Sequence, residues 1–213
     1  MRLLVYTPTY NGGPVAECRA SVLAQDYSGE WEWIIDTDDP FPTPDHRNVL
    51  AKFRRARQMA LDGGHDALVT VEHDMIVPHD ALTQFVKANE QVAYGVYKLR
   101  HGLRILNAWR ANANTGKPMH PPPQFQRLID DASEIMWPMS GCGWGCTFIR
   151  RDVLERITFT DSGENEAGDL AFSFDCLRNK VRAFAHFGVI CGHIDLDNGV
   201  TLWPFDLAVN HGD

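Results

Sequence analysis

The stretch ALVTVEHD, residues 67–74, is the part of the sequence that decides the fold. Its first five residues form a short apolar run, which predicts a strand buried on both faces. Gly63-Gly64 precedes this run and ends a helix predicted over 47–61, whose apolar side chains share one stripe. Pro78 follows the run and opens another predicted helix. The central strand is therefore flanked by helices on both sides along the chain.

The same alternation extends through the first half of the chain. Further strands are predicted over 3–6, 31–35 and 92–97, with a helix over 15–24. Strands that alternate with helices favour a mostly parallel sheet covered on both faces. The less regular second half adds helices over 151–157 and 169–180, a strand over 182–191, and a segment, 103–109, that can form a hairpin with 92–97. The prediction is one α/β domain with a smaller mixed region.

Composition limits the classes of function. The chain has 213 residues and a net charge of −8, which disfavours a general binder of nucleic acid or anionic membranes. A basic cluster between Lys98 and Arg110 still leaves a DNA acceptor open. The five cysteines form no C-x-x-C pair, so reduced thiols in a cytoplasmic protein are expected. No apolar run is long enough to span a bilayer, and the N-terminus opens into a predicted strand rather than a secretion signal.

Polar residues follow three of the predicted strands. They are Thr7-Pro8-Thr9, Asp36 and Glu72-His73-Asp74. In parallel sheets ligands bind outside the carboxyl ends of the strands, so these groups are expected to meet on one rim. Glu72 and Asp74 can both lean toward a hard divalent cation, which itself bridges the phosphates of a nucleotide. The alternative is an acidic turn that only caps the helix opened by Pro78.

The remaining candidates each have a functional and a structural interpretation. Asp169 is either a general base or an acid that favours the start of its helix, and Asp175 is a weaker candidate base. Asp36 can accept hydrogen bonds from a base or a ribose, or belong to a turn. His193 suits Mn²⁺ as a ligand, although a lone histidine is more often structural. Arg57 can reach a diphosphate or cover a helix, and Trp144 can stack on a ligand or fill the core.

The order of these residues resembles the inverting glycosyltransferase family 2, whose fold is called GT-A. The segment 7–11 is similar to the family's opening nucleotide-binding turn, and Asp36 matches its base-contacting acid. Ala56-Arg57 resembles the family's Ala-Arg-Asn segment, with Gln58 in place of Asn. The acidic turn 72–74 stands at the Asp-x-Asp position, with Glu72 in place of the first Asp. Residues 141–151 resemble the acceptor-side glycine-rich strand and the helix start that follows it.

Two further positions complete the resemblance. Asp169 stands where the family has its catalytic base, although Gly168 replaces the usual Glu, and His193 matches a late histidine that ligates the metal. The resemblance covers nearly the whole chain, with 1–100 as the nucleotide-sugar-binding half and 101–213 as the acceptor-binding and catalytic half. It implies that Mn²⁺ or Mg²⁺ is held by Asp74, Glu72 and His193. The donor-binding residues that it implies are Thr7, Pro8, Thr9, Tyr10, Asp36, Arg57, His73 and Trp144.

The function expected from this resemblance is transfer of a sugar from a nucleoside diphosphate, with UDP favoured, to an acceptor hydroxyl. Inversion follows if Asp169 is the base, while a retaining outcome stays open. The acceptor can be a glycan, a small molecule or a modified DNA base. Two alternatives remain: a sugar-1-phosphate nucleotidyltransferase and a non-catalytic nucleotide- or glycan-binding domain. The first would want Lys or Arg in the loop after the first strand, and residues 7–13 have neither.

Overall fold

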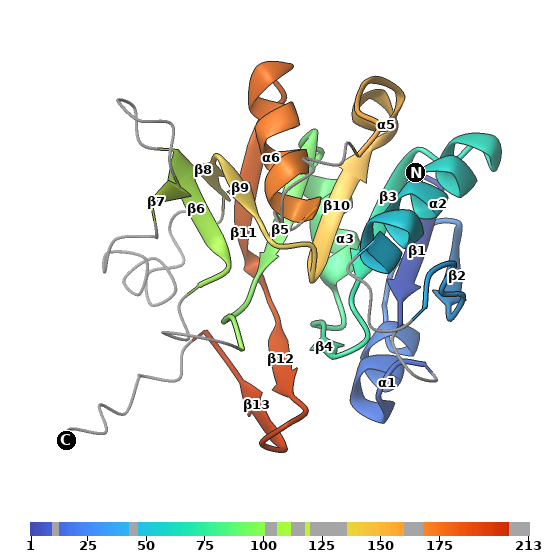
Figure 1. The fold of residues 1–213 in the computed structure, drawn as a ribbon, viewed down its shortest axis with the longest axis vertical. Helices are drawn as coiled ribbons and strands as arrows, with labels where there is room; N and C mark the ends of the chain where they lie inside the picture. The colour runs from blue at the N-terminus through green and yellow to red at the C-terminus, as the bar shows by residue number, and fades with distance from the viewer. Residues whose placement is uncertain are drawn as a thin grey trace.

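The computed structural model describes residues 1–9, 13–42, 47–100, 106–111, 118–119, 136–159 and 168–204. Its centre is a seven-stranded sheet (Figure 1). In spatial order the strands are β2 (Trp31–Asp36), β1 (Leu3–Pro8), β3 (Ala67–Val71), β10 (Cys146–Arg150), β5 (Val92–Val96), β11 (Ala183–Ile190) and β8 (Met136–Met139). The predicted strands are therefore confirmed, and strands from both predicted halves of the chain share one sheet.

The direction of the strands is more mixed than the sequence predicted. β2, β1, β3, β5 and β11 run one way, whereas β10 and β8 run the other. β10 lies between β3 and β5, so these two strands, which both follow from the alternating pattern, do not pair with each other. The carboxyl ends of the five strands with a common direction still reach the same edge of the sheet, and this edge is called the rim below.

Helices cover both faces of the sheet. Those in the described ranges are α1 (Ala16–Leu23), α2 (Arg47–Asp62), α3 (Ala81–Ala88), α5 (Arg151–Arg156) and α6 (Gly168–Arg178). Side chains of β1 alternate between the two cores: Leu4 and Tyr6 pack with α2, α5 and α6, whereas Leu3 and Val5 pack with α1 and α3. A strand buried on both faces has this period of two. The α/β class is therefore confirmed.

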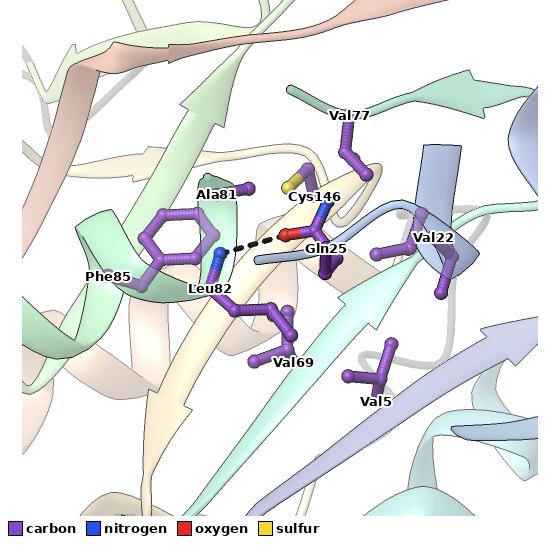
Figure 2. A pocket seen from close by; sticks show the side chains of 10 residues that line it. Val5, Val22, Gln25, Val69, Val77, Ala81, Leu82, Phe85 and Cys146 are labelled. Atoms are coloured by element: carbon purple, nitrogen blue, oxygen red, sulfur yellow. Dashed lines mark hydrogen bonds between the residues drawn. The ribbon is translucent and has the colours of Figure 1, made fainter. Parts of the chain in front are cut away.

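The layer of α1 and α3 encloses a small apolar cavity against the sheet (Figure 2). Val22 from α1 and Leu82 from α3 pack against Val5 and Val69 of the sheet around a small apolar cavity. Gln25, just after α1, accepts a hydrogen bond from the backbone N–H of Leu82 at 3.1 Å. The two helices are thus linked to each other as well as to the strands beneath them.

Two small sheets extend the rim. One contains β13 (Val200–Leu202), β12 (Gly192–Asp195) and β4 (Met75–Ile76), in that order, and leads away from the end of β11 in Figure 1. The other contains β7 (Pro118–Met119), β6 (Ala108–Ala111) and β9 (Gly141–Cys142). The predicted hairpin of 103–109 with 92–97 is only partly correct, because β6 pairs with β7 and β9. One isolated bridge, Lys98 to Leu106, joins the described parts of these segments.

The structure bears on two further features, membrane-spanning helices and the state of the cysteines. In the ranges described above, no helix is both long and apolar enough to cross a bilayer. Four cysteines, Cys18, Cys146, Cys176 and Cys191, are buried free thiols.

Candidate functional site

The rim forms because backbone bonds tie neighbouring strand ends together. The N–H of Thr9, just after β1, donates to the carbonyl of Asp36 at the end of β2 at 2.9 Å. On the other side of β1, the N–H of Val15 donates to the carbonyl of His73 at 3.0 Å. The three polar segments that the sequence placed at strand ends therefore lie at one edge of the sheet, as predicted.

Asp74 is the most deeply buried acid of this rim, with 1% of its side chain exposed. It stands in the turn between β3 and β4, and its backbone carbonyl accepts a hydrogen bond from Ile194 of β12 at 2.9 Å. Because β12 pairs with β4, with His193 opposite Met75, the imidazole of His193 is brought to the carboxylate. Nε2 of His193 lies 3.6 Å from Oδ2 of Asp74, so residues 119 positions apart meet through the pairing of two short strands.

The orientation of the His193 ring is fixed by a hydrogen bond of its other nitrogen, Nδ1. Its Nδ1 lies 2.7 Å from the backbone carbonyl oxygen of Lys98, which can only accept, so Nδ1 carries a proton and donates. In the neutral imidazole Nε2 then has a lone pair, and it faces the carboxylate of Asp74. Neither this Nε2 nor either oxygen of Asp74 has a hydrogen-bond partner among the described residues, although all three atoms are buried.

These unbonded atoms are what a divalent cation would use. A carboxylate and an imidazole whose other nitrogen donates to a carbonyl are a usual pair of ligands for ions such as Mn²⁺. The described residues nevertheless contain no cluster of three His, Cys, Asp or Glu side chains that could hold a metal. Of the set of three ligands that the sequence predicted, the described residues bring two, Asp74 and His193, within 3.6 Å of each other.

Glu72 is the residue missing from that set. The backbone turns between Glu72 and Met75, closed by a 3.1 Å hydrogen bond, and the Glu72 N–H donates to Gly145 at 2.9 Å. Burial raises the pKa of Glu72 to about 8, and the charges of Asp74 and Asp169 add to this effect. Glu72 therefore lies between two other acids, and at neutral pH its carboxyl is mostly protonated. Without a bound cation this carboxyl can therefore donate a hydrogen bond.

The electrostatics of Asp74 differ from those of Glu72. Burial acts to raise the pKa of Asp74, but His193, His73 and Arg100 outweigh it and lower that pKa below the usual value. Nη1 of Arg100 lies 2.6 Å from Oδ2 of Asp74. Asp74 is therefore ionised at neutral pH, as a ligand of a cation must be.

Asp169 lies at the start of α6, where the helix dipole favours a carboxylate. Its Oδ1 accepts a hydrogen bond from the N–H of Leu170 at 2.7 Å, and burial raises its pKa. Gly143 leaves room for Tyr97, because a Cβ there would lie 2.3 Å from the Tyr97 hydroxyl, and the same point lies 3.4 Å from Asp169 Oδ2. The structure therefore brings Asp169 close enough to Glu72 to influence its charge, which the sequence alone could not show.

Two hollows flank this group of acids. The first has a volume of about 180 Å³ and is lined by Pro8, Val49, Lys52, Glu72, His73, Asp74 and Arg100. The second, of about 220 Å³, is lined by Leu99, Leu106, Asn107, Ala108, Trp109, Gly143, Asp169 and Leu170. Below they are called the cationic hollow and the apolar hollow. Both adjoin the segment 72–74 or its neighbour Asp169, so an acid at each boundary is available to whatever binds there.

The cationic hollow contains two residues that the sequence analysis did not select as site residues. Lys52 is 1% exposed, and its ammonium contacts the carbonyl of Thr9 and lies 2.6 Å from Asp39 Oδ1. Arg100 contacts Asp74 as described. Arg100 occurs in the basic cluster noted from composition and Lys52 in a second basic run, residues 52–57, but only the fold distinguishes these two residues from arginines on helix surfaces. The half-buried His73 also lines this hollow, and burial lowers its pKa, so its imidazole is neutral at pH 7.

Asp36 has a different environment. Both of its oxygens lie 2.7 Å from Nη1 of Arg55, the hydroxyl of Tyr6 donates to Oδ2, and the N–H of Asp38 donates to Oδ1 at 3.0 Å. A carboxylate accepts about four hydrogen bonds, so little capacity remains for a nucleotide base. The predicted role of Asp36 in donor binding therefore requires one of these internal partners to be displaced.

Some of the other predicted donor-binding residues line the cationic hollow, and others are bonded inside the protein. Pro8 lines the cationic hollow, but the hydroxyl of Thr7 accepts a hydrogen bond from Trp33 at 2.9 Å, and that of Thr9 donates to the Asp36 carbonyl at 3.0 Å. Both threonine side chains are buried and hold β1 to β2. Tyr10 lies outside the described residues.

Arg57 and Trp144 are placed away from the cationic hollow. Nε of Arg57 donates to the carbonyls of Leu154 and Ile157, at 2.7 and 2.8 Å, and so holds the end of α5. The ring of Trp144 is 3% exposed and packs among the rings of Phe53, Phe159 and Phe172. The structure therefore places Trp144 in the core, without a free face for a sugar, and gives Arg57 a structural partner in place of a diphosphate.

Comparison with known proteins adds information about the fold. No family model matches the sequence, and no curated protein matches it. Among the solved structures that match the fold is the crystal structure of A197 from STIV, with a TM-score of 0.61 and 19% sequence identity. The match covers 95% of this chain and 94% of that one. At this identity the likeness shows that the two chains share a fold over nearly their whole lengths, and it leaves the chemistry to be argued from the site.

Proposed function

We propose that this protein is a GT-A-type glycosyltransferase that moves a sugar from a nucleoside-diphosphate donor to an acceptor hydroxyl. The observation that supports it most is the pair formed by Asp74 and His193, whose facing atoms are buried without hydrogen-bond partners. This pair borders a hollow containing Lys52 and Arg100, and Asp169 stands at the wall of a second hollow nearby. An anionic donor and a neutral acceptor need two such compartments.

The cationic hollow suits the diphosphate of the donor. Asp74 and His193 would hold Mn²⁺ or Mg²⁺, which supplies Lewis-acid stabilisation of the departing diphosphate. Lys52 and Arg100 add positive charge to the same hollow. Phosphate oxygens bind most strongly to such charged donors, and a partly dry hollow strengthens the attraction. Among the strand-end residues, Pro8 and His73 remain the proposed donor contacts.

The apolar hollow suits an acceptor without charge. Its walls are mainly apolar, with Trp109 and Leu106 among them, and Asp169 is the charged residue in its lining. An aromatic ring beside aliphatic side chains favours the apolar face of a sugar or another ring compound. A phosphorylated acceptor would meet the negative charge of Asp169. We therefore favour a neutral glycan or small molecule, and a phosphate-bearing acceptor could enter only with its charges kept outside.

Asp169 would act as the general base. Burial raises its pKa, which makes the carboxylate a stronger base than that of an exposed aspartate. It would take the proton of the acceptor hydroxyl as that oxygen attacks the anomeric carbon from the side opposite the diphosphate, and this geometry gives inversion. Glu72 lines the cationic hollow and would contact the bound donor.

The test of this function is a melting-temperature screen against UDP-, GDP- and dTDP-sugars, each with Mn²⁺ and with EDTA. At a hundredfold excess over Kd the matching donor should raise the melting temperature by about 5 °C or more, and only with the metal present. UDP-sugars are expected to give the largest shift. If no nucleotide changes the melting temperature even with Mn²⁺, the proposal is wrong. Metal-dependent hydrolysis of the matching donor would exclude a domain that only binds nucleotides.

A further inference from the structure

Arg100 is a cation in direct contact with Asp74. Its Nη1 lies 2.6 Å from Oδ2, and its side chain is 30% exposed, against 1% for Asp74. The contact is an ion pair without an aligned hydrogen bond, since both oxygens of Asp74 still have no hydrogen-bond partner among the described residues. A buried carboxylate is costly to leave ionised, and the charge of Arg100 acts together with His193 and His73 to offset that cost.

The position of Arg100 conflicts with a cation between Asp74 and His193. A guanidinium at 2.6 Å from Oδ2 occupies one side of the oxygen that also faces His193, 3.6 Å away. A divalent ion bound there would repel the guanidinium strongly at such short range. Arg100 must therefore move when the ion enters. It is partly exposed and lines the cationic hollow with Lys52 and His73, so it has room to turn within that hollow.

The geometry points to Arg100 as a built-in stand-in for the metal, which neutralises Asp74 in the empty protein and is released onto the donor's diphosphate when the metal binds. This inference rests on the proposed function, because it assigns the diphosphate as the second partner of Arg100. A guanidinium binds phosphate oxygens in a two-pronged way that an ammonium cannot reproduce, which is why an arginine suits both partners.

A coupling between the two ligands follows. The metal alone has to displace Arg100 and leave it without a partner, so it binds weakly. The metal and the diphosphate together give Asp74 and Arg100 a new partner each, so each ligand strengthens the binding of the other by the same factor. Without Arg100, the metal would bind more tightly by itself, and the nucleotide would bind less tightly.

The experiment is a pair of titrations on wild type and Arg100→Gln. Free Mn²⁺ is measured by electron paramagnetic resonance, and UDP binding at saturating Mn²⁺ is measured by calorimetry. The substitution should tighten Mn²⁺ alone by about tenfold and weaken UDP by about tenfold, both within the usual range of coupling between sites. Arg156→Gln is the matched control, because Arg156 pairs with Asp152 on the exposed face of α5, and it should change neither constant.

The opposite signs separate this role from a structural one. A damaged site would weaken both ligands, and that result, or unchanged affinity for both, would overturn the inference while leaving the proposed function standing. If Arg100→Gln does not fold, Arg100→Lys tests the same point, since it should retain the weak binding of Mn²⁺ alone but bind UDP less tightly than wild type. Equal UDP affinity in Arg100→Lys would then contradict the role of Arg100. A wild-type protein that binds neither ligand would refute both proposals together.

Discussion

The ends of β2 and β3 each carry a buried acid, but the two acids have opposite surroundings. Asp36, after β2, receives hydrogen bonds from Tyr6 and the Asp38 backbone and two short contacts from Arg55. Asp74, after β3, has one ion pair and no hydrogen-bond partner among the described residues. Both are at the same rim of the same sheet, and burial is similar for the two.

The difference shows how to separate a structural acid from one available for a ligand. A buried carboxylate that is fully hydrogen-bonded stabilises the fold, and a ligand must compete with its internal partners. A buried carboxylate that lacks hydrogen bonds, next to other acids with shifted pKa values, is a candidate for binding or catalysis. On this comparison substitutions near β3 should change function, and substitutions near β2 should change stability.

The largest expected effect belongs to Asp169, on the β3 side of the comparison. Asp169→Asn keeps the shape and the helix start but removes the base, so turnover should fall about 10²- to 10⁴-fold. Donor affinity should stay within about twofold of wild type, because the side chain does not line the cationic hollow. Sugar transfer and UDP binding are measured on the same preparation.

The control for Asp169 is Asp175→Asn. Asp175 is on the same helix, and it forms an ion pair with Arg178 at 3.0 Å. This variant should transfer sugar at nearly the wild-type rate. A loss of turnover as large as that of Asp169→Asn would show that α6 as a whole, rather than one carboxylate, had been disturbed.

The next effect is on stability and belongs to the β2 side. Asp36→Asn removes the charge that Arg55 contacts, and the free energy of unfolding should fall by about 2 kcal/mol, discounted for the partial exposure of Arg55. Asp74→Asn should change the unfolding free energy of the metal-free protein by only about 1 kcal/mol or less, because the desolvation of the carboxylate is relieved as its ion pair is lost. Urea unfolding of both variants measures the contrast, and the comparison fails if Asp74→Asn is the less stable of the two.

The last effect concerns the pH dependence of stability, through Glu72. The folded-state pKa of about 8 exceeds the unfolded value of about 4.3, so between these values the folded protein binds more protons. Stability from this group is therefore lost as pH rises from about 5 to 8, by up to about 1.4 kcal/mol per pH unit. Glu72→Gln should flatten that slope in urea unfolding of the metal-free protein. An unchanged slope would mean that Glu72 titrates normally.

Much of the framework could be predicted from the sequence, because it depends on local patterns. The apolar run 67–71 and the stripe of 47–61 specify a strand and a helix by period alone, and both are observed as β3 and α2. The insertion of β10 between β3 and β5 could not be predicted, since it depends on pairing between residues far apart in the chain.

The site was predictable to a lesser degree. Asp74 and His193 were selected from the sequence, but their approach depends on the two-residue strand β4, which is too short to leave a pattern. Trp144 illustrates the opposite limit: a tryptophan beside glycines suits a stacking site or a core, and only the packing of Phe53 and Phe159 around it decides in favour of the core. In the sequence, Arg100 could be recognised only as one of the basic residues between Lys98 and Arg110.

The central claim is that Asp74 links a metal to the donor's diphosphate. Calorimetric titration of UDP into wild type and Asp74→Asn, each with saturating Mn²⁺ and with EDTA, tests it most directly. Wild type should bind UDP with Mn²⁺ and lose most of that affinity in EDTA, whereas Asp74→Asn should bind weakly in both conditions. Equal UDP affinity of Asp74→Asn and wild type in the presence of Mn²⁺ would contradict the account.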